Sequence, residues 1–519
     1  MALDYKNIGK LFSLNIINIV LNFAYSTLMI YLFGTSREIE AFFAASVLGT
    51  AVSRFVQTGQ LVEIIVPKYH KVKSEIGNQA AMSIISMMAN YMSGIAFLLV
   101  LVFIAGGTSV VNLLVPGFEK TAQQHVYQIF CVTGFLMPIQ IATNLFQGML
   151  NAENIYGKVE ITNTVSLLVN LLILVIWGQS HTADILVVGL VFSVIMQFLT
   201  TLYYLRQVGY KHSFAFKSQY LPFKEMWQAI SAATFYMGGV QVYMFAFNAA
   251  LSFLPAGVFA TYRYVEVIYG KVANVFMMPI STVFFNEINR FLNQQNSSKI
   301  KAFVTQNLNF SYFIGFMIFI PFLAGGQYLI WTAWGGVKFD ANAAQRVYEL
   351  LTIFFLGMLL TGPYMIFRKM SVSVTRPDLQ YYFWGITHII SGLLSYLLLQ
   401  RFGFQGLLAQ IIIHNIITTS VPILTVYFLK KQYFALYSST EVLKITSALL
   451  LSLVIVWLMK SYFVDFKYTT KFISAQIGLF VATISGTTFI LLCYFLQVEE
   501  IQILKTKLQE TLRRFTIFR

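Results

Sequence analysis

The feature that most constrains this chain is the recurrence of apolar runs about 20 residues long, the length that crosses a bilayer as a helix. Inside a bilayer, every backbone polar group must be satisfied within the protein, and runs of this length do so as helices. Charged residues make up only 11% of the 519 positions and hydrophobic residues 57%. Sliding windows place about fourteen spans, near residues 9–33, 40–66, 80–106, 123–150, 158–178, 183–206, 224–250, 257–286, 302–326, 345–368, 379–400, 404–429, 441–461 and 471–497. The sequence therefore predicts an all-α polytopic membrane protein.

The distribution of basic residues orients these spans. An even number of spans puts both termini on one side of the membrane. Placing that side in the cytoplasm collects 24 of the 35 Lys and Arg residues in cytoplasmic segments and leaves 8 on the opposite side, the asymmetry typical of membrane proteins. We therefore expect a multi-pass protein of the bacterial cytoplasmic membrane with both termini cytoplasmic. The same topology accounts for the net charge of +15 without nucleic acid as a partner.

Two stretches of sequence recur, which indicates an internal duplication. Ala41–Ala44 aligns with Gly257–Ala260 at an offset of 216, and AQQHVYQIFCVTGFLMPIQ resembles AAQRVYELLTIFFLGMLLT at an offset of 221. Because an even number of spans separates the copies, the repeats share one orientation and are related by an axis along the membrane normal. We predict two six-helix halves in a parallel pseudo-twofold arrangement, followed by two further helices and a tail. The predicted parts are residues 1–207 (N-terminal half), 208–223 (cytoplasmic linker), 224–430 (C-terminal half), 431–497 (helices 13 and 14) and 498–519 (basic amphipathic cytoplasmic tail).

Charged residues inside these spans are the first candidates for a functional site. A charged side chain at mid-bilayer costs about 2.5–3.5 kcal/mol on insertion scales, so it faces a partner or a hydrated cavity. The cations are Arg54, Arg263 and Lys271. Their arrangement favours a cavity for an anionic lipid headgroup, because Arg binds phosphate bidentately and Lys adds a point charge. The alternative is internal neutralisation by the acidic residues Glu40, Glu63 and Glu266.

Several motifs resemble the MurJ/MviN lipid II flippase family of the multidrug/oligosaccharidyl-lipid/polysaccharide exporter superfamily. They are FGTSREIEAFFAAS followed by SRFVQTGQLVEIIVP, then LLVPGFEKTA, FQGMLNAENIYG and IPFLAGGQYLIWTAWGGVKFD. The resemblance covers roughly residues 1–400 and implies a flippase for a polyprenyl-diphosphate-linked cell-envelope precursor. Where the family carries arginines in its first helix this chain has asparagines, and Val267 follows Glu266 where the family has an arginine. The resemblance thus implies either lipid II or a related lipid-linked oligosaccharide as substrate.

Polar residues in the first and fifth spans are further candidates. Asn15, Asn18 and Asn22 lie on one helical face and suit either sugar hydroxyls or hydrogen bonds between helices. Glu160 and Asn163 suggest a site for a coupling ion, although an acid near a helix start also stabilises the helix N-terminus.

The chain lacks the sequence motifs of ATPases, serine hydrolases and zinc proteases. We therefore expect a secondary transporter with no cofactor, working by alternating access and driven by Na⁺, H⁺ or the membrane potential. The expected partners are the lipid-linked oligosaccharide, membrane lipids and an envelope glycan synthase, with the protein itself a monomer. Two alternatives stay open: a cation-coupled multidrug exporter of the same superfamily, and a transport-inactive scaffold for an envelope synthase.

Overall fold

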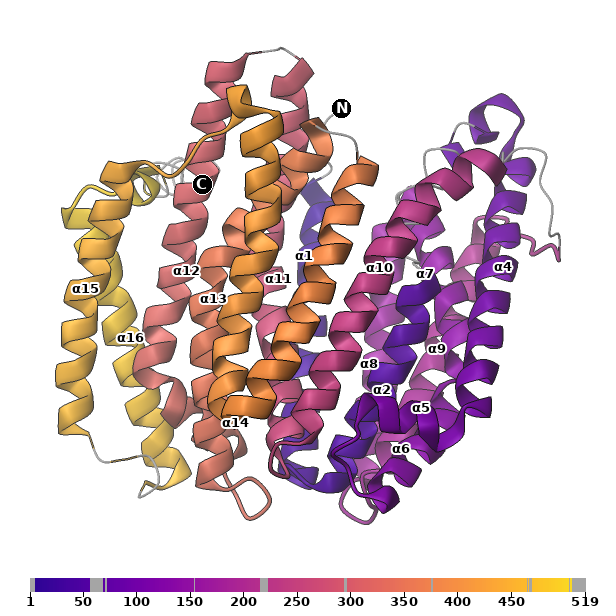
Figure 1. Ribbon diagram of the computed structural model, residues 1–519, viewed down its shortest axis with the longest axis horizontal. Coiled ribbons are helices and arrows are strands. Elements are labelled where there is room, and N and C mark those ends of the chain that lie inside the picture. Colours follow the sequence, from indigo (N-terminus) through magenta and orange to yellow (C-terminus); the bar gives the residue numbers. More distant parts are fainter. Residues whose placement is uncertain are drawn as a thin grey trace. The chain divides into compact units, whose positions relative to one another are not determined.

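The computed structural model describes residues 5–56, 69–70, 72–153, 155–214, 223–293, 296–374, 377–463, 465, 469–503 and 505. Every regular element in this part of the chain is helical (Figure 1). The helices are α1 (Tyr5–Phe33), α2 (Arg37–Val56), α4 (Asn78–Ala105), α5 (Gly107–Leu114), α6 (Lys120–Thr133), α7 (Leu136–Ala152), α8 (Tyr156–Trp177), α9 (Ile185–Gln207), α10 (Phe223–Ser252), α11 (Val258–Asn293), α12 (Ser297–Trp334), α13 (Ala341–Val374), α14 (Pro377–Leu429), α15 (Ser439–Tyr462) and α16 (Lys471–Phe495), with a 3₁₀ turn at Lys431–Tyr433.

The described helices overlap the predicted spans, the second of which is described only as far as Val56, with two differences in detail. The predicted span at 123–150 is a pair of helices, α6 and α7, bent by 47°. The helix α5 lies in no predicted span. The predicted spans at 379–400 and 404–429 are two helices that meet at the non-helical Gly403 (φ 57°) and share the label α14. By length and composition, nine of the described helices can cross a membrane, or ten if the bent pair is one span. The all-α membrane class is confirmed, and the count of fourteen stays a prediction.

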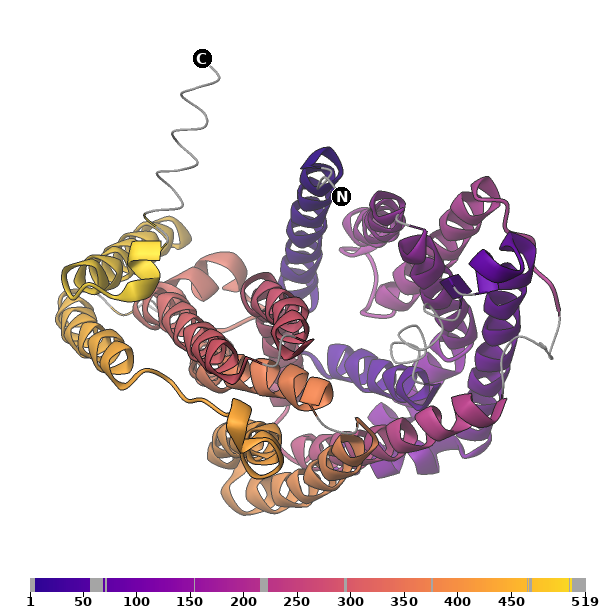
Figure 2. The same cartoon turned by 90° about the horizontal axis from the view of Figure 1, so that it is seen from above.

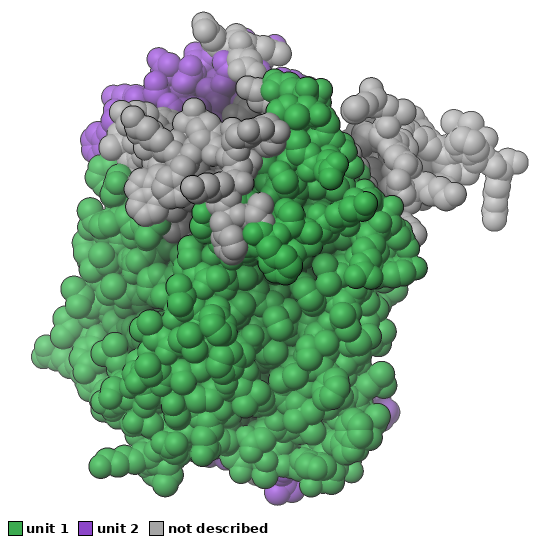
Figure 3. All heavy atoms as spheres, turned by 90° about the vertical axis from the view of Figure 1, so that its right-hand side faces the viewer, with its two compact units in different colours: residues 1–260, 381–403 green, residues 261–380, 404–519 purple. Residues whose placement is uncertain are grey.

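The chain forms two compact units, coloured separately in Figure 3. The first contains Met1–Ala260 and Tyr381–Gly403, and the second contains Thr261–Gln380 and Phe404–Arg519. The first unit thus takes α10 and the first part of α14 along with α1 to α9. These units are not the predicted sequence halves, whose boundary at 208–223 lies partly outside the described residues and stays a prediction.

In the first unit, neighbouring helices pack in pairs: α1 with α8, α8 with α9, and α4 with α7. The second unit centres on α12, which packs against α13 and α16. Its buried core joins the C-terminal half of α11 to α12, α13 and the end of α14 through Phe284, Ile288, Ile300, Val304, Leu308, Ile366, Phe367, Met370 and Val426. The two helices predicted as additions, α15 and α16, lie side by side against α12 (Figures 1 and 2). Of the predicted tail, residues 506–519 lie outside the described part.

Candidate functional site

Glu40, predicted as a charge partner or cavity-lining residue, is fully buried in the first turns of α2. One carboxylate oxygen, Oε1, accepts hydrogen bonds from the backbone N–H groups of Gly257 (2.8 Å) and Ala260 (3.4 Å). The other, Oε2, lies 2.6 Å from the Arg37 guanidinium. Carboxylates are stabilised at helix N-termini, where backbone N–H groups lack helical acceptors. Glu40 therefore ties α2 to the first turn of α11, and its charge is matched by Arg37.

The Pro-Gly-Phe loop before α6 packs beside the Glu40–Arg37 ion pair. Arg37 lies 4.6 Å above the Phe118 ring, and Phe118 packs edge-on against Phe259 at 5.4 Å between ring centroids. The Gly117 N–H donates to Ser252 Oγ at 2.9 Å. A Cβ on Gly117 would come within 2.5 Å of the Ser252 carbonyl oxygen, so only glycine fits. Two of the sequence motifs, distant along the chain, thus form one junction within the first unit.

Charged residues of α11 form a second cluster, within the second unit. Arg263, Glu266 and Lys271 fall within an arc of about 140° around α11 at about 100° per residue. The opposite side of the helix packs on α13, where Tyr269 Oη lies 2.7 Å from Thr361 Oγ1. Arg263 donates to Glu266 Oε2 at 2.5 Å; the Arg263 side chain is 8% exposed and that of Glu266 is 42% exposed.

Lys271 differs from Arg263 in having no matching charge. It is exposed, and none of the hydrogen bonds or ion pairs among the described residues involves its ammonium group. Of the two predicted site cations on α11, Arg263 has the acidic partner that a structural role requires, whereas Lys271 has none among the described residues.

Arg54 lies half-buried in the last turn of α2. It belongs to the first unit, while Arg263 and Lys271 belong to the second. The structure places the last two on one helix, and a joint site of all three cations stays a prediction. Glu63 lies outside the described residues.

A polar network joins α1 to α8 inside the first unit. Asn18 Nδ2 donates to Glu160 Oε2 at 2.9 Å, and Thr164 Oγ1 donates to Asn18 Oδ1 at 2.6 Å. Asn22 instead donates to the Asn18 carbonyl oxygen within its own helix. The side chain of Asn15 lies outside the described part. Asn18 therefore makes the hydrogen bonds between helices that the sequence offered as one of two interpretations.

A second set of hydrogen bonds on α8 centres on Asn163, one turn after Glu160. Asn163 Oδ1 accepts hydrogen bonds from Gln147 Nε2 of α7 (3.2 Å) and Gln197 Nε2 of α9 (2.9 Å). Gln147 Nε2 also donates to Thr162 Oγ1 at 2.8 Å. Carboxylate and amide oxygens are the ligands that hard cations prefer, so Glu160 and Asn163 present suitable donors. Among the described residues, no three His, Cys, Asp or Glu side chains cluster as a metal site would require.

Comparison with known families decides between the transporter classes that share these features. The model of the family described as lipid II flippase MurJ matches residues 29–491. The chain belongs to the MurJ lipid II flippase family. This MurJ-family chain is accordingly a membrane transporter and not a catalytic enzyme.

Solved structures show the same fold. A structure of lipid II flippase MurJ in an inward closed conformation matches with a TM-score of 0.72 at 17% identity, covering 92% of this chain and 98% of that one. A multidrug resistance MATE family transporter in an inward-facing conformation matches with a TM-score of 0.63 at 11% identity, covering 80% and 95%. An outward-facing structure from the MATE family matches at 0.57 and 13% identity, covering 82% and 96%. None of the curated proteins compared with the MurJ-family chain matches it significantly.

Sequence reasoning offered Glu266 as a charge partner, and its pairing with Arg263 is observed, but the partners of Glu40 were missed. Sequence reasoning did not single out Arg37, although the spacing of three residues between Arg37 and Glu40 permits a pair on one helix face. The glycine at 257, with φ of +89°, gave no signal that its N–H would meet a carboxylate from a segment 217 residues away.

Proposed function

We propose that this protein is a flippase that moves a polyprenyl-diphosphate-linked envelope precursor, lipid II or a related lipid-linked oligosaccharide, across the bacterial cytoplasmic membrane for peptidoglycan biosynthesis. The observation that carries the proposal is the family match over residues 29–491. The cationic residues Arg54, Arg263 and Lys271 add the chemistry that a diphosphate headgroup needs. Both termini are cytoplasmic in this proposal, and the monomer supplies its precursor to an envelope glycan synthase.

Lys271 makes the first contact with the diphosphate. Its ammonium group is exposed, and no carboxylate among the described residues neutralises it. Arg263 can follow by exchanging Glu266 for a phosphate oxygen, because Glu266 is 42% exposed and can be rehydrated. Exchange of one anionic partner for another keeps the largely buried guanidinium paired throughout, which avoids the cost of a buried uncompensated charge.

Transport proceeds by alternating access between inward- and outward-facing states. Support comes from the fold, which matches transporters solved in inward-facing and outward-facing conformations. Glu160 and Asn163 supply the coupling site for Na⁺ or H⁺ in this mechanism, since they lie one turn apart on α8, where Glu160 is bonded to α1 and Asn163 to α7 and α9. Binding a cation there would compete with the Asn18 hydrogen bond to Glu160 and so alter how α1 packs on α8. The membrane potential alone is the alternative driving force.

The test uses the full-length protein in liposomes with a fluorescent lipid II analogue. Lys271→Gln should preserve folding, and it should weaken headgroup binding about tenfold or more, since a hydrogen bond to a charged group contributes about 1.5–3 kcal/mol. The matched control is Lys301→Gln, which removes an exposed cation from the first turns of α12 and should leave binding and flipping unchanged.

The outcome also separates the competing functions. Wild-type protein that flips the analogue supports the flippase proposal, and equal activity in Lys271→Gln and wild type would remove Lys271 from the site. Wild-type protein that folds, fails to flip any lipid-linked sugar, and expels cationic dyes would make the multidrug exporter correct. Loss of both activities, with retained binding to an envelope synthase, would make the scaffold correct.

A further inference from the structure

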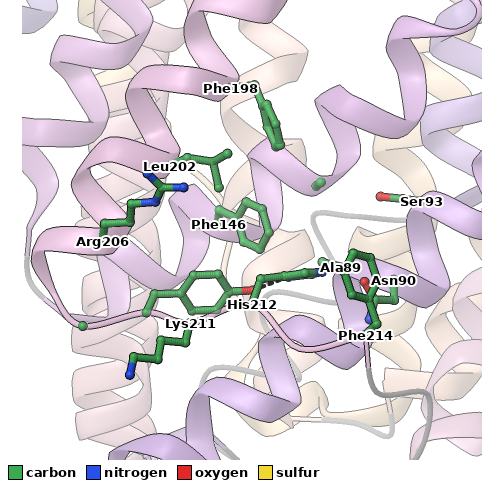
Figure 4. A pocket seen from close by; sticks show the side chains of 13 residues that line it. Ala89, Asn90, Ser93, Phe146, Phe198, Leu202, Arg206, Lys211, His212 and Phe214 are labelled. Carbon is green, nitrogen blue, oxygen red and sulfur yellow. Dashed lines mark hydrogen bonds between the residues drawn. The ribbon is translucent and has the colours of Figure 1, made fainter.

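A cavity of about 900 Å³ lies in the first unit, between α4, α7, α9 and the segment 208–214 that follows α9 (Figure 4). It is separate from the candidate residues on α2 and α11. Its walls are apolar and aromatic, with Phe146 of α7 facing Phe198 and Leu202 of α9. The remaining wall is the chain after α9, including Tyr210, His212 and Phe214.

Hydrogen bonds hold this wall in place. Tyr210 Oη lies 2.8 Å from Ser86 Oγ on α4 and 2.9 Å from His212 Nδ1. Asn90 Nδ2, also on α4, donates to the Ser213 carbonyl oxygen at 2.9 Å. The rings of Phe146 and Tyr210 pack at 5.4 Å between centroids. The cavity is therefore built before any ligand arrives, which lowers the entropy cost of binding.

The polar end of the cavity is positively charged. Arg206 and Lys211 lie toward the same side in Figure 4, and both are exposed. Neither side chain makes a hydrogen bond or ion pair within the described residues. The described lining contains no Asp or Glu. Burial lowers the pKa of His212, so this ring is neutral near pH 7 and the charge comes from Arg206 and Lys211.

The helix α9, which lines the cavity, also carries an exposed apolar surface that suits lipid. Exposed apolar residues recur along α9 every three or four positions, at Val188, Phe192, Ile195, Leu199 and Tyr203. This spacing makes one continuous stripe on a helix. Phe198 and Leu202 each precede a member of the stripe by one residue, about 100° around the helix, so α9 carries the cavity wall on one side and the exposed apolar stripe on a neighbouring side.

We propose that this cavity binds an anionic membrane phospholipid, with its phosphate held by Arg206 and Lys211 and an acyl chain packed on Phe146, Phe198 and Leu202. The combination of an apolar wall, on a helix that also exposes an apolar stripe, and two unneutralised cations fits a molecule that carries both a chain and a phosphate. A soluble phosphorylated compound would leave the apolar wall hydrated. The lining of this cavity shares no residue with the proposed headgroup site.

The test is native mass spectrometry of the full-length protein, released from nanodiscs that contain equal amounts of phosphatidylglycerol and phosphatidylcholine. We expect wild type to retain one phosphatidylglycerol in preference to phosphatidylcholine. In Arg206→Gln/Lys211→Gln the affinity for it should fall about fivefold for each cation removed, as expected for basic residues near anionic lipid. The matched control is Lys299→Gln/Lys301→Gln, which removes two exposed cations from the start of α12 and should retain the lipid.

Three results would overturn the proposal. Equal retention of the two lipids by wild type would show that the cavity does not select an anionic headgroup. An equal loss in both double variants would show general attraction of anionic lipid to a basic protein surface. Displacement of the bound lipid by glycerol phosphate at the same concentration as phosphatidylglycerol would show that the acyl chain contributes nothing and that the ligand is a soluble phosphate compound.

Discussion

Removing the Glu40 carboxylate should destabilise the first unit strongly. Glu40 is fully buried. It forms an ion pair with Arg37 at 2.6 Å and accepts hydrogen bonds from the backbone N–H groups of Gly257 and Ala260 at 2.8 and 3.4 Å. In Glu40→Ala, the Gly257 N–H loses its acceptor, and leaving a buried donor unsatisfied lowers the free energy of unfolding by about 1–3 kcal/mol. Arg37 loses its ion-pair partner, but its side chain is 34% exposed and regains hydration. With about 1–2 kcal/mol for the lost ion pair, the sum is about 2–5 kcal/mol.

Glu40→Gln separates the hydrogen bonds from the charge. The amide oxygen can still accept from Gly257, so the remaining loss is the ion pair with a partly exposed Arg37, about 1–2 kcal/mol. The matched control is Glu38→Ala in the same turn of α2. Glu38 is exposed, and its described contact is a 3.3 Å hydrogen bond from the Ala183 N–H, so its removal should cost under about 1 kcal/mol.

Thermal unfolding of the purified protein at one fixed scan rate measures the series. At roughly 2 °C per kcal/mol for a unit of this size, Glu40→Ala should lower the midpoint by about 4–10 °C and Glu40→Gln by about 2–4 °C. Glu38→Ala should lie within about 2 °C of wild type. Equal midpoints for Glu40→Ala and Glu38→Ala would refute the reasoning, because they would show that the buried carboxylate does not hold the start of α11.

Three further predictions concern loops and termini. Burial raises the pKa of Glu500 from 4.5 to about 7. Because the buried carboxyl is favoured in its neutral form, the packing of residues 499–503 should be strongest at low pH and weaken as pH rises through about 7. Hydrogen exchange of these residues should show this pH dependence in wild type and not in Glu500→Gln. Burial alone would raise the pKa of Glu153, but hydrogen bonds from Lys73 and Tyr69 outweigh it and lower the pKa below 4.5. The Lys73 pair thus adds stability above pH 4.5 that disappears as pH falls through the folded pKa, and the unfolding midpoints of wild type and Lys73→Gln should converge in acid. Gly117→Ala should cost about 1–3 kcal/mol by overpacking against the Ser252 carbonyl, measured by the same thermal assay, and an unchanged midpoint would show that the loop can move aside.

The apolar runs and their flanking residues were enough to predict where the helices lie, because a segment in lipid must satisfy its own backbone hydrogen bonds. That requirement is local, so it can be read from about 20 neighbouring residues. The bend between α6 and α7 escaped prediction because both helices are apolar and their composition carries no sign of the break. The order and spacing of short motifs also predicted the transporter family, because these motifs lie at loops and helix ends, where local geometry restricts which residues fit.

The sequence by itself thus determined the membrane class, the helix positions, the family and the identity of the charged candidates. Only the tertiary structure decided which charges are matched. Arg263 is paired with Glu266 while Lys271, on the same helix, is not, and Glu40 meets an α11 N-terminus far along the chain. The cavity beside α9 is likewise built from α4, α7 and a loop. Such pairings depend on contacts between segments that are distant in sequence, and the free energy of a charge in a membrane depends on those neighbours more than on the residue itself.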